Sequence, residues 1–297
     1  MDEQKQKIID GANEFVKYIV AGMPQLDANG NVRYYFSGSL AMLLLYSAKS
    51  IKSFYLDDSG KSVKQTHQFS IPDKNRESLV AGIRQLNSDV DIVPIDKMVL
   101  KPLADRQHCN MATVAKNCPL ISDLSTKLLK CCTTMYFDCL NEDRVFMGHD
   151  VAEITLQDGE KIFIADPLCL IIHKLADAIT ALTIIKDMSI KGSLKPDAKL
   201  RLQKKYQPKL KDFVPMFNCL ASLYNVDYKE FVEHIAETYQ ETAFTNVLET
   251  KYIDIIERFR EEAKEQVEEE YRPLLDKFID AILDQNMKMQ ELLVKPQ

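Results

Sequence analysis

The sequence predicts an α+β fold: a small mixed β-sheet with flanking helices, followed by an all-helical region. Short apolar runs rich in β-forming residues alternate with helical patterns up to about residue 185. Beyond that point only helical patterns occur, and Gly192, Ser193 and Pro196 interrupt the chain between the two regions. We therefore predict an α/β domain at residues 1–190 and a helical domain at residues 191–297.

The composition is that of a globular protein with an ordinary core, since 46% of the 297 residues are hydrophobic and 28% are charged. The net charge of −6 argues against a protein that coats DNA nonspecifically. The seven cysteines form no CxxC pair, so we expect reduced thiols, no zinc site and a cytoplasmic location. The sequence has neither a signal-peptide core nor a run of roughly 18–20 apolar residues, so we expect no membrane span.

The N-terminal third is predicted to form a strand, a Gly-Ser turn and a buried helix. Apolar residues at helical spacing predict an amphipathic helix over 4–22, and Asp27–Asn31 is typical of a turn. A short strand over Val32–Phe36 then enters Ser37-Gly38-Ser39. The apolar run Leu40–Ala48 predicts a helix after this turn.

Further strands and helices are expected in the middle of the chain. Asp57–Gly60 predicts a turn between two short strands, and a helix is expected over 75–86. Val90–Val93 is typical of a strand that stops at Pro94. A helix near 122–129 and a strand over Cys132–Leu140 follow.

A hairpin and a long helix close the predicted α/β domain. Asp158-Gly159 between the apolar runs 151–156 and 161–165 is a strong hairpin signal. Asp166-Pro167 is a typical helix start, and this helix should run to about Ile185. The helical domain is expected to contain helices over 197–205, 209–224, 227–239 and 245–293, the last broken near Pro273.

Two aspartates on a predicted strand are the first candidate site residues. Asp89 and Asp91 alternate with Val90 and Ile92, so they should project from the same face of the strand. Two carboxylates so placed repel each other, and a divalent cation removes the repulsion. Mg²⁺, or Mn²⁺ in its place, prefers carboxylate and phosphate oxygens, which suits a nucleotide site. An isolated Asp-x-Asp is also common on solvent-facing strand edges.

A phosphate-binding turn and a third acid complete the candidate set. Gly38 lets the backbone approach a phosphate, Ser39 adds a hydroxyl, and the helix that follows offers free N–H groups. Asp138 stands among β-forming residues, where a buried carboxylate needs a partner such as a metal ion. Glu153 is the alternative third acid.

This order of elements resembles the polymerase-β-like nucleotidyltransferase superfamily. The stretch Ile164–Ala178 is similar to the strand and Lys-Leu-x-Ala helix of AbiE-type toxin nucleotidyltransferases, with Lys174 as the lysine, and Lys211-Asp212-Phe213 is similar to their downstream basic-Lys-Asp helix. The resemblance covers roughly residues 30–220. It departs from the family in an insertion of about residues 49–85 between the Gly-Ser turn and the acidic pair.

The resemblance implies a Mg²⁺-dependent transfer of a nucleotide from an NTP to an acceptor, in a protein of toxin type. Asp89, Asp91 and Asp138 would be the catalytic and metal-binding residues. Gly38, Ser39 and Lys174 would contact the nucleotide phosphates, although Lys174 also fits an ordinary helix-surface lysine.

RNA, a protein side chain and a small molecule are alternative acceptors. The lysine-rich segment 186–211 would suit a nucleic-acid acceptor or a solvated helix face. The alternative function is that of a non-catalytic binding or regulatory module with the same fold.

Overall fold

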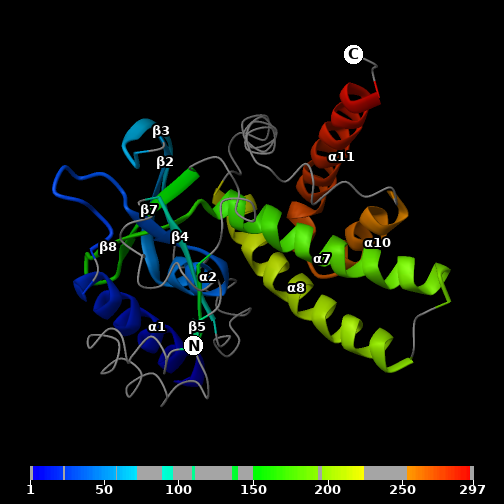
Figure 1. Ribbon diagram of the computed structural model, residues 1–297, viewed down its shortest axis with the longest axis horizontal. Coiled ribbons are helices and arrows are strands. Elements are labelled where there is room, and N and C mark those ends of the chain that lie inside the picture. The colour runs from blue at the N-terminus through cyan, green and yellow to red at the C-terminus, as the bar shows by residue number, and fades with distance from the viewer. Residues whose placement is uncertain are drawn as a thin grey trace. The chain divides into compact units, whose positions relative to one another are not determined.

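The computed structural model describes residues 3–22, 24–57, 59–71, 89–95, 109–110, 136–139, 150–192, 196–223 and 253–294. These residues form a mixed α/β part and a helical C-terminal part, which confirms the predicted fold class at this level (Figure 1). The chain separates into two compact units, Met1–Leu170 and Ile171–Gln297. They divide inside helix α7 (Pro167–Ile190), whereas the boundary predicted at 190/191 coincides with the end of that helix. None of the helices within the described ranges combines the length and apolarity that a membrane crossing requires.

A mixed sheet of eight strands forms the centre of the first unit, in the order β3-β2-β7-β8-β1-β4-β6-β5. The neighbours β8–β1 and β4–β6 are parallel, and all the other neighbours are antiparallel. We call β3, β2, β7 and β8 the hairpin half of the sheet, and β1, β4, β6 and β5 the acid half. The strands are β1 (Tyr34–Phe36), β2 (Ala48–Leu56), β3 (Ser62–Ser70), β4 (Asp89–Pro94), β5 (Cys109–Asn110), β6 (Tyr136–Cys139), β7 (Asp150–Leu156) and β8 (Lys161–Ala165).

The predicted hairpin and the predicted turn between two strands are both confirmed in the hairpin half, although β2 and β3 are longer than the short strands predicted. β2 and β3 pair as antiparallel strands on either side of the predicted turn. In this turn a carboxylate oxygen of Asp57 accepts hydrogen bonds from the backbone N–H groups of Ser59 (2.9 Å) and Lys61 (3.0 Å). β7 and β8 pair across the Asp158-Gly159 turn. Much of the predicted insertion at 49–85 is thus the β2–β3 hairpin, which widens the sheet beyond β7.

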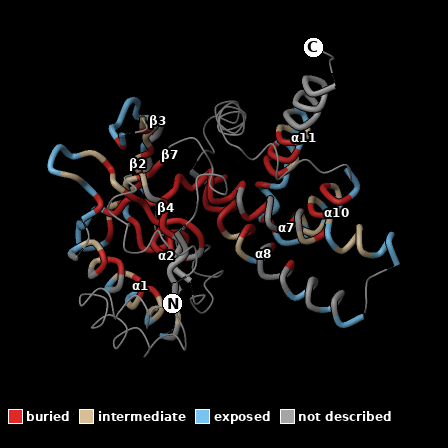
Figure 2. The backbone as a smooth tube through the Cα atoms, viewed as in Figure 1, coloured by how far each residue is buried: buried red, intermediate tan, exposed pale blue. Residues whose placement is uncertain are grey.

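Helices α1 (Glu3–Gly22) and α2 (Gly38–Ser47) confirm the two N-terminal helix predictions. Buried Ile9, Val16 and Ile19 recur at helical spacing along α1. From Leu40 onward α2 is buried along its whole length (Figure 2), and it packs against α1, β4 and β7. A helix enclosed in this way needs the nearly continuous apolar sequence that the prediction used. Because α2 packs against the sheet, the Gly-Ser turn that precedes it also lies next to the sheet.

The first strand is shorter than the predicted Val32–Phe36, because Val32 makes other contacts. Its N–H donates to the carbonyl oxygen of Gly60 (2.8 Å), and it forms an isolated bridge with Leu26. Gly60 has a φ of +78°, and a Cβ atom at this position would lie 1.9 Å from the Val32 carbonyl oxygen. Only glycine therefore allows the β2–β3 turn to approach the segment before β1 this closely.

The predicted division between helices 197–205 and 209–224 is wrong, because one helix, α8 (Pro196–Leu223), runs through Pro208. A proline inside a helix removes one backbone hydrogen bond, and its ring clashes with the preceding turn, so it usually kinks or breaks the helix. Tyr206, Leu210 and Phe213 are buried on both sides of the proline, so packing outweighs the local preference. The predicted helices at 75–86, 122–129 and 227–239 lie outside the described residues.

The predicted break near Pro273 in the helix at 245–293 is confirmed, and it lies just before the proline. The described part contains α10 (Ile253–Lys264), a 3-10 turn η3 (Glu269–Tyr271) and α11 (Arg272–Val294). Pro273 lies in the first turn of α11, where the missing N–H has no helical partner to lose. β5 is an additional strand that the sequence did not predict.

Four phenylalanines form the core of the helical unit. The ring of Phe213 in α8 lies 5.6 Å from that of Phe217, 5.0 Å from that of Phe259 in α10 and 6.0 Å from that of Phe278 in α11. All four side chains are fully buried. Aromatic pairs at these separations add to the free energy of burial, so the cluster ties α8, α10 and α11 together.

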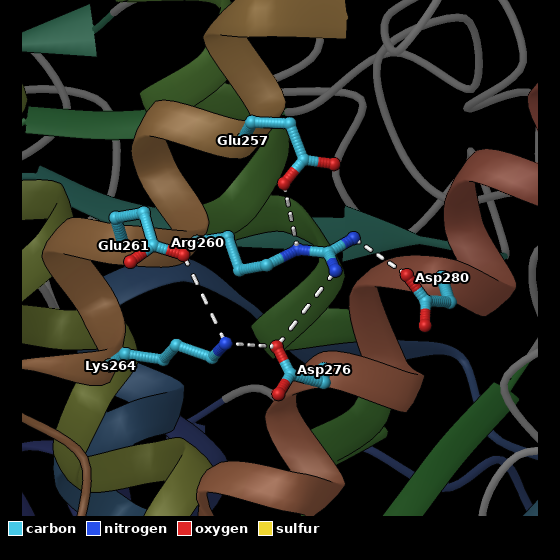
Figure 3. Close-up of polar contacts among 6 residues, drawn as sticks. All are labelled: Glu257, Arg260, Glu261, Lys264, Asp276 and Asp280. Atoms are coloured by element: carbon cyan, nitrogen blue, oxygen red, sulfur yellow. Dashed lines mark hydrogen bonds and ion pairs between the residues drawn. The ribbon is translucent and has the colours of Figure 1, made fainter.

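An ion network joins α10 and α11 beside this core (Figure 3). Arg260 lies between Glu257 of its own helix (3.3 Å) and Asp280 of α11 (2.6 Å). Lys264 contacts Asp276 of α11 at 2.7 Å. The Arg260 side chain is only 13% exposed, so these contacts are better shielded than ordinary surface pairs. On α7, Lys186 also contacts both carboxylate oxygens of Asp254 in α10, each at 2.5 Å.

Candidate functional site

The strand register brings two of the predicted acids into adjacent positions. β4 and β6 are parallel neighbours, and Asp91 is the direct partner of Asp138. Asp89 is paired with Tyr136 in the same ladder. Residues two apart on a strand share a face, and so do directly paired residues, so positions 89, 91 and 138 fall on one face of the sheet. We call this the acid face.

The Gly-Ser turn begins beside these positions. β1 is the other neighbour of β4, and the last residue of β1, Phe36, is paired with Ile92. The chain therefore leaves β1 at the level of Asp91. Gly38 has a φ of +59°, a left-handed conformation that glycine adopts without strain, and it is the first residue of α2. The turn, β4 and β6 are thus consecutive across the sheet.

Ser37, which the sequence analysis did not single out, has a distinctive position at this turn. It stands at the N-cap of α2 in an extended conformation, but its side chain makes no capping hydrogen bond. The hydroxyl is fully buried and finds no hydrogen-bond partner among the residues that the structure describes. An unpaired buried hydroxyl is costly and uncommon. Its place before Gly38 in Ser-Gly-Ser was the only signal in the sequence.

The backbones of Ser39, Asp89, Asp91 and Asp138 are described, whereas their side chains lie outside the described part of the structure. Register and strand alternation therefore carry the argument for these residues. Among the side chains that the structure does describe, no group of three or more His, Cys, Asp or Glu residues could hold a metal ion.

Glu153, the alternative third acid, lies on the same face but in the other half of the sheet. It belongs to β7, and β8 and β1 separate β7 from β4. Neighbouring strands lie about 4.8 Å apart, so three spacings place its backbone roughly 14 Å from β4. Its carboxylate oxygen contacts Lys161 at 2.9 Å. Glu153 therefore has a local cationic partner, and its strand does not adjoin Asp91.

A tyrosine without charge, Tyr35, also lies on the acid face. Its strand, β1, lies between β7, which carries Glu153, and β4, which carries Asp91. Tyr35 is paired with Val93 of β4 and is 3% exposed. Burial, reinforced by Cys169 and Asp150, raises the pKa of the Tyr35 phenol well above its ordinary value. The phenol therefore stays protonated at neutral pH and adds no negative charge to this face.

Lys174, the predicted phosphate contact, belongs to the second compact unit. It lies in α7, is 5% exposed, and its Nζ is 3.5 Å from a carboxylate oxygen of Asp212 in α8. Both residues come from segments that carry the family resemblance. A buried lysine needs a compensating charge, and Asp212 supplies one inside the helical unit.

The buried carboxylate of Asp166, which the sequence analysis predicted as a helix cap, fixes the start of α7 and also makes a contact that was not predicted. One oxygen of Asp166 accepts the N–H of Leu168 at 2.8 Å, which confirms the predicted cap. The other oxygen accepts the hydroxyl of Ser53 in β2 at 2.5 Å. Asp166 and Ser53 are each 4% exposed. No sequence signal linked them, because they are far apart in the chain. Both oxygens of Asp166 are thus engaged in structural contacts.

Comparisons of the chain with protein-family models, with curated proteins and with solved structures found no match. Any functional conclusion therefore rests on the residues and on the geometry of the sheet.

Proposed function

We propose that this protein is a Mg²⁺-dependent nucleotidyltransferase that moves a nucleotide from an NTP to an acceptor. One observation carries the proposal: Asp91 and Asp138 are register partners on adjacent parallel strands, and the Gly38 turn opens from the strand on the other side of β4. This juxtaposition joins three strands that lie far apart in the sequence. It suits a carboxylate cluster beside a phosphate-binding turn.

In this proposal Asp89, Asp91 and Asp138 hold Mg²⁺, or Mn²⁺ in its place. The cation would neutralise charge on the triphosphate oxygens. The register supports Asp138 over Glu153 as the third acid, because β6 adjoins β4 and β7 does not. The local pairing of Glu153 with Lys161 is consistent with a structural role.

The turn before α2 would contact the phosphates. Gly38 brings the backbone close, and the first N–H groups of α2 are suited to anions. The hydroxyl of Ser37, which has no partner within the described part of the chain, supports this assignment, because it could donate a hydrogen bond to a phosphate oxygen if the turn opened to admit the nucleotide. Contacts from Ser39 and Lys174 to the nucleotide remain predictions from the family resemblance. A cytoplasmic location remains a prediction from the cysteine pattern of the sequence.

The proposal is tested by label transfer. The full-length protein is incubated with Mg²⁺, each α-labelled NTP in turn, and either total RNA or cell extract. We expect label on one acceptor class, which would also distinguish RNA, protein and small-molecule acceptors. The Asp89→Ala/Asp91→Ala double variant should lose the transfer, because the cation would lose two ligands. Equal transfer by the wild type and the double variant would overturn the proposal.

A matched pair of variants tests the choice of third acid. Asp138→Asn should lower the rate about a hundredfold or more, as expected when a metal ligand worth several kcal/mol is lost. Glu153→Gln lies on the same face and should retain the wild-type rate within about threefold. The reverse ranking would refute the assignment of Asp138. If the wild type transfers nothing and ATP with Mg²⁺ fails to raise its melting temperature, the results favour the alternative function, a non-catalytic binding module.

A further inference from the structure

The seam between the two halves of the sheet is unusually short. β8 and β1 are paired at a single position, Phe36 with Ile164. The preceding residue of β8, Phe163, directs its backbone N–H and carbonyl to the side chain of Gln25, outside both strands. A side chain thus continues the ladder where strand pairing stops.

The carboxamide of Gln25 is fully used in this position. Its Nε2 donates to the carbonyl oxygens of Phe163 (2.8 Å) and Tyr34 (3.3 Å), and its Oε1 accepts the N–H of Phe163 (2.8 Å). A primary amide has two N–H donors and a carbonyl acceptor, so it can replace a peptide group of a neighbouring strand. Gln25 is 3% exposed, so water cannot substitute for these bonds.

The backbone around Gln25 holds the amide in place. The carbonyl oxygen of Gln25 accepts the N–H of Arg33 at 2.8 Å, and the next residue, Leu26, bridges to Val32. Arg33 in turn accepts a hydrogen bond from the N–H of Ile95, just beyond β4, at 2.8 Å. The backbone that carries the amide is therefore tied to the segments next to β1 and β4.

We propose that Gln25 is a positioning residue, which sets the register of β1 against β8 and thereby the place of the Gly38 turn beside Asp91. This inference rests on the proposed function, since the turn and the acid are its candidate site. β1 is only three residues long and carries the turn at its end. A shift of β1 along β8 would therefore move the turn and disturb the pairing with β4.

The test compares Gln25→Leu with Gln157→Leu in the full-length protein. Gln157 is exposed, lies in the β7–β8 turn, and its side chain makes one hydrogen bond, to the Ser47 carbonyl at 3.3 Å. Mn²⁺ affinity is measured by calorimetry, and backbone amide exchange is followed by mass spectrometry. We expect Gln25→Leu to weaken Mn²⁺ binding about tenfold or more, as outer-shell changes at metal sites do. Exchange should accelerate in β1, β4 and the first turn of α2, while the β2–β3 hairpin keeps its wild-type rates. Gln157→Leu should change neither measurement.

The outcomes separate the two hypotheses. Wild-type protein that binds no Mn²⁺ overturns the proposed function, and the positioning role with it. Mn²⁺ binding by the wild type, with unchanged affinity and exchange in Gln25→Leu, overturns the positioning role alone. If Gln25→Leu does not fold, Gln25→Glu takes its place, because it keeps the volume and an acceptor for the Phe163 N–H while removing at least one of the two donors. Wild-type affinity in Gln25→Glu would likewise overturn the positioning role.

Discussion

The two halves of the sheet are built in different ways. The hairpin half consists of two hairpins, β2–β3 and β7–β8, joined by the nonlocal pairing of β2 with β7, and β2 and β3 have nine residues each. In the acid half, β1 has three residues, β6 four and β5 two, and the partners come from distant parts of the sequence. The half with extensive local pairing has no role in the proposed chemistry. The half with the candidate site depends on nonlocal contacts and on one side-chain amide.

This difference suggests a division of labour between the halves. Each hairpin forms from local contacts with little loss of loop entropy, and the long pairing of β2 with β7 joins the two hairpins into one frame. The acid half is then positioned against this frame through β1, Gln25 and the contact between Val32 and Gly60. Variants in the frame should change stability, whereas changes at the acid positions should alter metal binding.

The largest expected effect on stability comes from Gly60→Ala, where the frame touches the segment before β1. A Cβ at Gly60 would lie 1.9 Å from the Val32 carbonyl oxygen, and the residue has a φ of +78°. The left-handed conformation and the backbone overlap should together lower the free energy of unfolding by about 3–4 kcal/mol. Urea denaturation of the full-length protein measures this loss.

Gly159→Ala is the matched control for this contact. Gly159 lies in the other hairpin turn with a φ of +93°, but nothing lies within 4 Å of a Cβ at this position. Only the conformational cost applies, so the loss should be about 1–2 kcal/mol. Equal losses in the two variants would show that the approach of Gly60 to Val32 does not contribute to stability.

The next largest effect should come from adding metal to the acid half. With Mn²⁺ at a hundred times its dissociation constant, the free energy of unfolding should rise by about 2.7 kcal/mol. Amide exchange should slow mainly in β4 and β6, because the proposed ligands lie there. Asp91→Asn should abolish the gain. Slower exchange confined to the hairpin half would place any metal site away from the acid half.

Sequence reasoning predicted the hairpin half well because its signals are local. Asp57–Gly60 and Asp158-Gly159 mark turns directly, and the flanking runs of β-formers define the strands. The apolar composition of Leu40–Ala48 also predicted the buried helix α2, and Asp166-Pro167 predicted the cap of α7. The division of α8 at Pro208 was predicted wrongly, because the burial of Tyr206 and Phe213 outweighs a local preference that sequence alone reports.

The candidate site shows where such reasoning stops. Strand alternation places Asp89 and Asp91 on one face, but only the register shows that Asp138 is paired with Asp91 and that β8 and β1 separate Glu153 from β4. Sequence patterns do not state which strands are neighbours. The role of Gln25 could not be predicted either, because its partner Phe163 lies 138 residues away in the sequence.

A smaller loss of stability is expected from Ser53→Ala, which tests whether the frame acts on stability alone. The Ser53 hydroxyl donates to the buried carboxylate of Asp166 at 2.5 Å. Removing this donor should lower the free energy of unfolding by about 2 kcal/mol, as is typical for a buried hydrogen bond to a charged group. Mn²⁺ affinity should stay within about twofold of the wild type.

Ser189→Ala controls for the loss of a hydroxyl. Ser189 is exposed, and its hydroxyl donates to the Ile185 carbonyl of its own helix, so the change should stay within about 0.5 kcal/mol. If Ser53→Ala weakens Mn²⁺ binding as strongly as Gln25→Leu, the frame and the acid half are coupled more tightly than this division of labour allows.

The smallest expected effect is a pH dependence in the frame. Hydrogen bonds from the Ser59 hydroxyl and the Lys61 backbone hold the pKa of Asp57 below its ordinary value. The ionised carboxylate is therefore favoured in the folded state. Its contribution is present above the unfolded-state pKa, near 3.9, and is lost as the pH falls through the lower folded value. Carboxyl NMR titration should find this lowered pKa, and the stability difference between the wild type and Asp57→Asn should shrink below about pH 4.

Because the turn is exposed and belongs to the frame, Asp57→Asn should leave Mn²⁺ affinity at neutral pH unchanged. A change in that affinity would mean that the Asp57 carboxylate, and not only the contact between Gly60 and Val32, positions the acid half.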